Sequence, residues 1–223
     1  MLLNYKKKLV TADSLDIAVS MGMDSVAISY FLSNGRRDLR LHYVNHGTEY
    51  AKSAESKFYD YVKWLSDKSK IKITGLVHNE PPSEKLNKEA EFRDFRYGYF
   101  DSFFKNKKGI NELVVCHHLD DAIESYLMNA FTSATYDRKL PETTQRENYN
   151  IIRPFLLTPK ENIIKYSSKE FNNLTEWIVE DPSNQDTSIR RNWIRLVIAP
   201  QIKEQYAGLP KVVKKLYNEK EGS

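Results

Sequence analysis

Short, continuously apolar segments alternate along this chain with longer segments that have helical periodicity. The apolar segments have the composition of buried strands: Leu15–Ser20, Leu39–Val44, Ile71–Val77 and Glu112–Cys116. Each is followed by a segment with apolar residues on one helical face: Asp24–Ser33, Glu55–Leu65, Leu86–Phe104 and Asp120–Phe131. Strands that are apolar throughout are typical of a parallel sheet covered by helices. The sequence therefore predicts a doubly wound, mostly parallel α/β sheet with helices on both faces.

The remainder of the chain, from Thr132 onward, has a less regular pattern. Thr132–Asn150 is polar and lacks periodicity, which predicts a loop. We expect an extended segment at Ile151–Leu157, helices at Pro159–Phe171 and Ile189–Gln205, and a weak helix that frays from Gly208 onward. The expected organisation is one domain over residues 1–200 and a basic C-terminal tail over residues 201–223.

The composition excludes several kinds of site. Cys116 is the single cysteine, which excludes an internal disulfide, a CxxC pair and a cysteine-built zinc or iron–sulfur site. No glycine precedes Lys-Ser or Lys-Thr and no two form G-x-G, which excludes a Walker A loop and a dinucleotide fingerprint. No apolar run approaches the ~20 residues of a membrane span, and the N-terminus lacks the apolar region of a secretion signal. We expect a cytoplasmic protein without a membrane partner.

The net charge of +4 is unevenly distributed. From Ser188 to the end there are eight Lys and Arg against three Asp and Glu, so the basic excess lies in this part. A solvated helix face is the usual explanation of such a run. A binding surface for a phosphate-rich partner is the alternative.

The first candidate motif is Ser20–Ser25 (SMGMDS), between the first predicted strand and helix. Ligands of doubly wound sheets bind at the carboxyl ends of strands, and free N–H groups at a helix N-terminus suit phosphate. Ser20 and Ser25 could donate further hydrogen bonds, and Asp24 could hold a Mg²⁺ that carries the phosphate. A plain helix N-cap is the alternative interpretation.

The second candidate motif is Cys116–Glu124 (CHHLDDAIE), at the end of the fourth predicted strand. His118, Asp121 and Glu124 are three residues apart, so they can point the same way from a helix. Such a cluster can bind a metal ion or transfer protons. Acidic capping of the first helical turn is the alternative. We expect both motifs on the same edge of the sheet.

Two pairs of arginines complete the candidates. Arg93 and Arg96 lie in the third predicted helix, whereas Arg191 and Arg195 follow Glu180–Asn184 (EDPSN) and share a helical face. Guanidinium groups suit the phosphates of ATP or RNA. Surface ion pairs are the alternative for any single arginine.

In this order the motifs resemble the tRNA(Ile)-lysidine synthetase family, within the PP-loop superfamily of N-type ATP pyrophosphatases. The resemblance extends from about Leu15 to Pro200, and its EDPSN and Arg-Asn-x-x-Arg ending points to this family in particular. The matching segments are Ser20–Ser25, Val44–Gly47, Glu89-Ala90 with Arg93, Arg96 and Tyr97, His117–Ser125, Arg153-Pro154 with Leu156, Glu180–Asn184, and Arg191-Asn192 with Arg195.

The resemblance implies an ATP-dependent ligase that acts on tRNA. An oxygen of the wobble cytidine in a CAU-anticodon isoleucine tRNA attacks the α-phosphorus of ATP, and pyrophosphate leaves. The amine of L-lysine then displaces AMP from the adenylylated base, which becomes lysidine. The implied cofactors are ATP and Mg²⁺, and the implied partners are tRNA and L-lysine.

The resemblance also implies roles for individual residues. The nucleotide and pyrophosphate contacts would be Ser20, Met21, Gly22, Met23, Asp24, Ser25, Asn45 and His46. The catalytic residues would be Asp24, His118, Asp121 and Glu124, of which Asp24 and Asp121 would bind Mg²⁺. The contacts to tRNA or nucleotide phosphates would be Arg93, Arg96, Arg191 and Arg195.

The chain departs from the family pattern in two ways. Met21 stands where the family has its first loop glycine, and Phe92 replaces a small residue of the arginine helix. Family members carry C-terminal domains that bind tRNA, whereas only a short stretch follows Pro200, so a homodimer or a helper protein could supply tRNA binding. Two alternatives stay open: a catalytically weakened relative that binds tRNA or nucleotide, and another tRNA-adenylating PP-loop enzyme.

Overall fold

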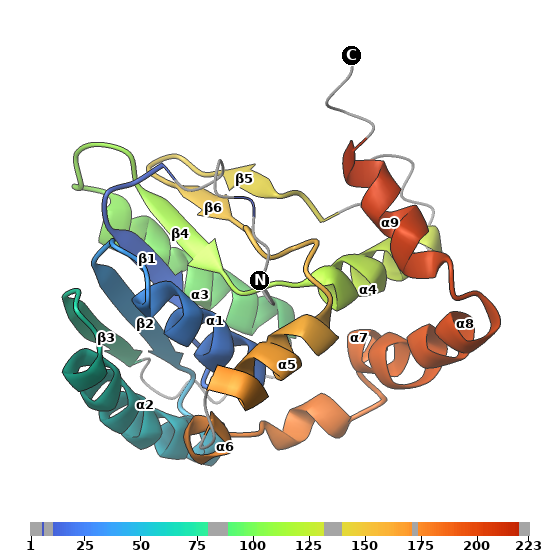
Figure 1. Cartoon of the computed structure of the whole chain (residues 1–223), viewed down its shortest axis with the longest axis horizontal. Coiled ribbons are helices and arrows are strands. Elements are labelled where there is room, and N and C mark those ends of the chain that lie inside the picture. The colour runs from blue at the N-terminus through green and yellow to red at the C-terminus, as the bar shows by residue number, and fades with distance from the viewer. Residues whose placement is uncertain (1–5, 7–10, 80–88, 132–139, 171–173, 219–223) are drawn as a thin grey trace.

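Six strands form a single mixed sheet in the order β3-β2-β1-β4-β6-β5 (Figure 1). The computed structural model describes residues 6, 11–79, 89–131, 140–170 and 174–218. The strands are β1 Leu15–Ala18, β2 Leu39–Asn45, β3 Ile73–Asn79, β4 Glu112–Val115, β5 Thr143–Gln145 and β6 Asn150–Ile152. All neighbours pair in parallel except β5, which is antiparallel to β6. The predicted doubly wound, mostly parallel sheet is confirmed.

Helices cover both faces of this sheet. On one face lie α1 (Met23–Ser33), α2 (Glu49–Lys68), α5 (Lys160–Glu170) and the short α6 (Leu174–Trp177), while α3 (Glu89–Phe104) lies behind the sheet (Figure 1). Their buried apolar side chains form a core with the strands: Phe58 and Tyr61 from α2 on one face, Phe100 and Phe104 from α3 on the other. The layered arrangement leaves the strand ends open for a site.

The prediction of a loop at Thr132–Asn150 is wrong for the second half of this range, where β5 pairs with β6 at the edge of the sheet. Buried Arg153 holds this strand by donating to the Pro141 carbonyl (2.8 Å) and the Thr144 hydroxyl (2.9 Å). Two of the three β5 side chains are exposed, so the strand has no apolar pattern to detect. Residues 132–139 lie outside the described part.

Among the described residues, the part of the chain after α6 contains helices and turns but no strand. After a 3₁₀ turn at Pro182–Gln185, the predicted helix at 189–205 forms as α7 (Arg190–Trp193), a π-helical segment (Ile194–Ile198) and α8 (Ala199–Gln205). Earlier in the chain, α4 (Leu119–Ala130) follows β4. The final helix, α9 (Leu209–Asn218), packs on α4 instead of fraying. Its residues Leu209, Val213 and Tyr217, four apart, are buried, and this spacing explains the docking. Of the helices the structure describes, none is long and apolar enough to cross a membrane.

Candidate active site

The two principal motifs meet at the switch point of the sheet. β1 and β4 are neighbours, and the strand order reverses between them. The loops that follow these strands therefore open at the same edge. His118 Nε2 lies 3.3 Å from Asp24 Oδ2, which confirms the expectation that the motifs share one edge.

The Ser20–Ser25 loop leaves the first turn of α1 open. Gly22 is the N-cap residue and no side chain caps the helix, so the plain N-cap interpretation is wrong here. Ser25 instead shapes the loop: its hydroxyl donates to the Gly22 carbonyl (2.9 Å) and accepts the Ser20 N–H (3.2 Å). The free N–H groups of a first helical turn form a binding site for an anion.

Met21 has a left-handed backbone conformation, with φ of 61°. This is the conformation that favours glycine, and it accounts for the glycine that the family has at this position. The Met21 carbonyl accepts the Val179 N–H (2.9 Å), which ties the loop to the segment after α6. The side chain is fully buried in the main core, so it does not fill the space over the loop.

Asp24 is a carboxylate with one oxygen engaged and the other without a partner among the described residues. Its Oδ2 contacts His118 and Lys160 Nζ (3.4 Å), whereas Oδ1 is buried and has no hydrogen-bond partner among the described residues. Burial raises the pKa of Asp24, but His118 and Lys160 outweigh burial and lower it overall. Lys160 is a site residue that sequence reasoning missed, because a lysine at the start of a helix carries no distinctive signal.

His118 and Asp121 cap α4 and also belong to the site. The His118 N–H donates to Asp121 Oδ2 (2.9 Å), and the Asp120 N–H donates to His118 Nδ1 (3.2 Å). Nε2 of His118 therefore faces Asp24. Burial lowers the pKa of His118, but the carboxylates of Asp121 and Asp24 outweigh it and raise it above the usual value. The helix-cap interpretation of this motif is therefore confirmed, and a functional role of the same residues stays a prediction.

Arg191 and Arg195 share a face, as predicted, and that face meets the carboxylates of α4. Arg191 bonds to Asp121 and to Glu124, each at 3.0 Å, and Arg195 bonds to both Glu124 oxygens at 2.7 and 3.0 Å. The ion-pair interpretation thus describes both arginines in this structure. Contact with a phosphate stays a prediction.

The EDPSN motif supports these arginines from outside the site. Asp181 caps the 3₁₀ turn by accepting the Ser183 N–H (2.9 Å). Buried Asn192 donates to the carbonyls of Ser183 (2.7 Å) and Asp186 (3.0 Å). The motif therefore fixes the turn to the helix that carries Arg191.

The turn after β2 holds Asn45 and His46. Asn45 accepts the Gly47 N–H (2.8 Å) and donates to Glu55, so its side chain shapes the turn. The His46 ring packs against Phe92, with ring centres 4.9 Å apart, and its Nδ1 is buried without a partner among the described residues. Burial, and then the nearby Arg96, lower the pKa of His46 to about 4, which leaves a neutral ring with an unused nitrogen.

The arginines of α3 lie near the edges of the site, Arg96 close to His46 and Arg93 close to Arg153. Arg93 and Arg96 are exposed, and the Arg93 guanidinium lies 5.4 Å from the centre of the Tyr97 ring. Buried Arg153 was part of the resemblance but was not predicted as a site residue. It donates to His117 Nδ1 (3.1 Å) beside the cluster.

The buried oxygen of Asp24 that lacks a partner among the described residues fits a Mg²⁺ ligand. Magnesium is usually held by one or two carboxylates together with phosphate oxygens and water. Asp121 already uses both oxygens, for Arg191 and for the His118 N–H. Within the described ranges no three His, Cys, Asp or Glu side chains form a metal-binding group. The residues present therefore suit an ion that Asp24 shares with a bound phosphate.

The sheet is mostly parallel, and its switch point carries carboxylates and the Ser20–Ser25 loop, which leaves a helix N-terminus free for phosphate. These features define a nucleotide-binding α/β domain. Residues 2–202 match the family model of the PP-loop domain, and the chain belongs to this family.

Named relatives narrow the similarity to tRNA-modifying proteins. The chain is 32% identical over 199 residues to the tRNA(Ile)-lysidine synthase of Staphylococcus aureus strain COL, covering 86% of this chain and 44% of the relative. It is 30% identical over 181 residues to that of Campylobacter jejuni strain NCTC 11168, covering 80% and 53%. The chain therefore spans about half the length of the curated relatives it matches.

A solved structure shows the same fold. The U34-tRNA thiolase NcsA from Methanococcus maripaludis superimposes with a TM-score of 0.69 at 15% sequence identity. The match covers 96% of this chain and 75% of that one.

Proposed function

We propose that this chain ligates L-lysine to the wobble cytidine of a CAU-anticodon isoleucine tRNA through an adenylylated base, with ATP and Mg²⁺. The observation that carries the proposal is the meeting of Asp24 and His118 beside the uncapped N-terminus of α1. Phosphate would bind the free N–H groups of that helix, close to Lys160. The similarity to the lysidine synthases supplies the substrates.

The residues around Asp24 would perform the first half-reaction. The cytidine oxygen forms a bond to the α-phosphorus and the bond to pyrophosphate breaks. The α1 N-terminus, Ser20 and Ser25 would stabilise the charge on the leaving pyrophosphate. A Mg²⁺ held at Asp24 would supply Lewis-acid neutralisation of the phosphate oxygens. His118 and Lys160 keep the Asp24 carboxylate ionised, in line with its lowered pKa.

The carboxylates of α4 would perform the second half-reaction. Asp121 and Glu124 would orient the ammonium of L-lysine. One of these carboxylates would receive the proton after Arg191 or Arg195 releases it, so that the free amine can displace AMP. Arg191 and Arg195 hold both carboxylates in place. They could also exchange one of these contacts for a phosphate of the tRNA.

The test follows both half-reactions with labelled L-lysine, ATP, Mg²⁺ and a tRNA transcript with the CAU anticodon. We expect label in the tRNA and pyrophosphate release that requires the tRNA. Asp24→Asn should abolish both signals. Glu124→Gln should block lysine incorporation more than tRNA-dependent pyrophosphate release.

Asp13→Asn is the matched control, because Asp13 is exposed before β1, away from the strand ends that carry the site. Loss of both signals in this control as well would remove the support for Asp24. A wild-type chain that binds tRNA without turnover would instead favour the weakened relative.

The structure bears on both alternatives. Met21 was one of two arguments for a weakened relative, and its side chain points into the core. The second argument, the short C-terminal part, is unaffected. For sulfur transfer, the one cysteine in the chain, Cys116, is unsuited, because burial raises the pKa of its thiol and disfavours the nucleophilic thiolate.

A further inference from the structure

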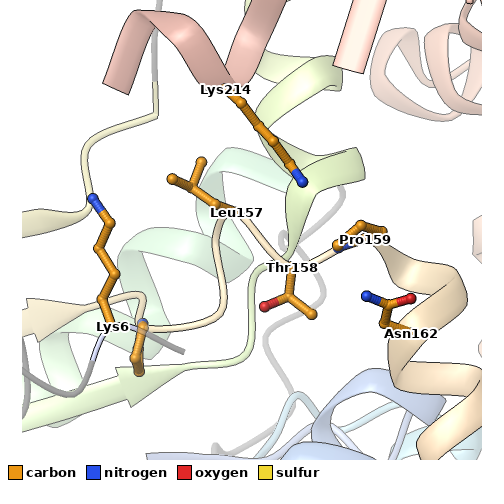
Figure 2. A pocket seen from close by; sticks show the side chains of 7 residues that line it. Lys6, Leu157, Thr158, Pro159, Asn162 and Lys214 are labelled. Atoms are coloured by element: carbon orange, nitrogen blue, oxygen red, sulfur yellow. The ribbon is translucent and has the colours of Figure 1, made fainter. Parts of the chain in front are cut away.

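A pocket of about 330 Å³ lies beside the candidate active site, between Lys6, α5 and α9 (Figure 2). Seven residues line it: Lys6, Pro154, Leu157, Thr158, Pro159, Asn162 and Lys214. The Thr158 hydroxyl and the Asn162 amide lie on one side, and Lys214 extends toward them from α9 (Figure 2). The lining thus combines two lysines, a hydroxyl group and an amide with three apolar residues, and the seven residues include no carboxylate.

The two lysines of the pocket differ in their pairing. Lys6 forms an ion pair with Glu142 at 3.0 Å, so its charge is already compensated. Lys214 is half-buried and has no ion pair among the described residues. A half-buried ammonium without a counter-ion favours an anionic ligand.

The helix that carries Lys214 presents more positive charge. From Leu209 to Asn218, α9 contains Lys211, Lys214 and Lys215 but no Asp or Glu. Its apolar side packs on α4, which leaves Lys211 and Lys215 exposed. By contrast, the basic residues nearest before α9, Arg191, Arg195 and Lys203, are all ion-paired with carboxylates of α4. On α9, Lys211 and Lys214 therefore carry positive charge that no carboxylate of the described residues pairs.

The pocket is joined to the active site by one short segment. The Thr158 carbonyl accepts the N–H of Leu119, the first residue of α4, at 3.0 Å. Two residues after Thr158, Lys160 contacts Asp24. An anion in the pocket would therefore be a close neighbour of a nucleotide held at Asp24.

We infer that this pocket and α9 form a docking surface for the phosphodiester backbone of an RNA, with Lys214 as the central contact. A row of lysines that continues beyond the pocket suits repeated phosphates better than a single phosphate ion. The RNA identity of the partner rests on the proposed function. The surface would hold the backbone next to the base that reacts.

The experiment measures the affinity of the full chain for the CAU-anticodon tRNA transcript at several salt concentrations. Lys214→Gln removes the charge and keeps most of the stem. We expect weaker binding and a slope of log K against log salt that is smaller by about 0.9, as for the loss of one phosphate contact. Lys211→Gln should add a further decrease.

Two matched variants control for general charge loss. Lys6 lines the same pocket, but its charge is compensated by Glu142. Lys6→Gln should therefore change the slope of log K against log salt less than Lys214→Gln does. Lys70→Gln removes an exposed lysine before β3, at the opposite edge of the sheet, and should leave the slope unchanged. Equal effects of Lys70→Gln and Lys214→Gln would overturn the docking surface.

The remaining outcomes separate this inference from the proposed function. If the wild-type chain modifies tRNA and Lys214→Gln keeps the wild-type slope, the docking surface is refuted and the function stands. If no lysine is incorporated but the slope depends on Lys214, the surface stands and the function fails. Weaker ATP or inorganic phosphate binding by Lys214→Gln, with unchanged RNA binding, would assign the pocket to a small anion and overturn the RNA proposal.

Discussion

Replacement of Met21 by glycine tests the left-handed backbone conformation of the Ser20–Ser25 loop. The residue combines a φ of 61° with a side chain that is 0% exposed, so the substitution relieves strain and removes core packing at the same time. We expect Met21→Gly to lower the free energy of unfolding while nucleotide affinity stays unchanged, because the side chain points away from the loop.

The size of the effect follows from two opposing contributions. Truncation of a buried Met to Ala costs about 2–5 kcal/mol through lost transfer energy and the cavity. The left-handed conformation destabilises a residue with a Cβ by about 1–2 kcal/mol, and glycine avoids this strain. Glycine in turn loses about 0.4–1 kcal/mol of stability, because it has greater conformational freedom in the unfolded chain. Met21→Gly should therefore be less stable than wild type, but more stable than Met21→Ala by up to about 1.6 kcal/mol.

Urea denaturation of both variants measures these differences, and each 1 kcal/mol corresponds to about 2–4 °C in Tm for a domain of this size. Ile28 in α1 is the matched control, because it is also 0% exposed but has ordinary helical backbone. There alanine should be more stable than glycine by about 1 kcal/mol. The same ranking at Met21 would refute the left-handed conformation. A gain in nucleotide affinity without loss of stability would place the side chain over the loop.

Three further predictions concern the ion pairs and hydrogen bonds that support the site and the core. Arg191→Met should lower the free energy of unfolding, measured by urea denaturation, by about 2–3 kcal/mol, which is less than the about 3–5 kcal/mol lost from a fully buried pair. In a Glu124→Gln background the same substitution should cost much less, and equal costs in both backgrounds would disprove the coupling. Burial lowers the pKa of His42 although its Nε2 lies 2.7 Å from Asp16. Because the unfolded chain then takes up the proton first, the free energy of unfolding should fall as the pH drops below about 6.5 toward the pKa of the folded state. An NMR titration that gives His42 a pKa above about 6.5 would contradict this. Asn192→Ala should cost about 1–2 kcal/mol and raise the KM for lysine, and an unchanged KM would show that the EDPSN turn does not aim the arginines.

The sequence alone was sufficient for the layers of the fold and for the edge of the sheet that carries the site. Apolar strands and periodic helices are local patterns, and parallel pairing then places every loop that follows a strand at the same edge. Ser20–Ser25 and His117–Glu124 could therefore be brought together before any coordinates were known. The elements that lacked a local pattern, such as β5 with its exposed polar side chains, could not be predicted in this way.

Only the tertiary structure decided which side chains face one another. Lys160 contacts Asp24 across 136 positions of sequence, and Arg191 reaches Asp121 across 70, so no spacing rule connects them. The direction of the Met21 side chain and the docking of α9 on α4 also depend on packing between distant segments. Local sequence sets helix and strand because their hydrogen bonds join near neighbours or regular ladders. The charges of the site are instead paired by the way whole helices pack on the sheet.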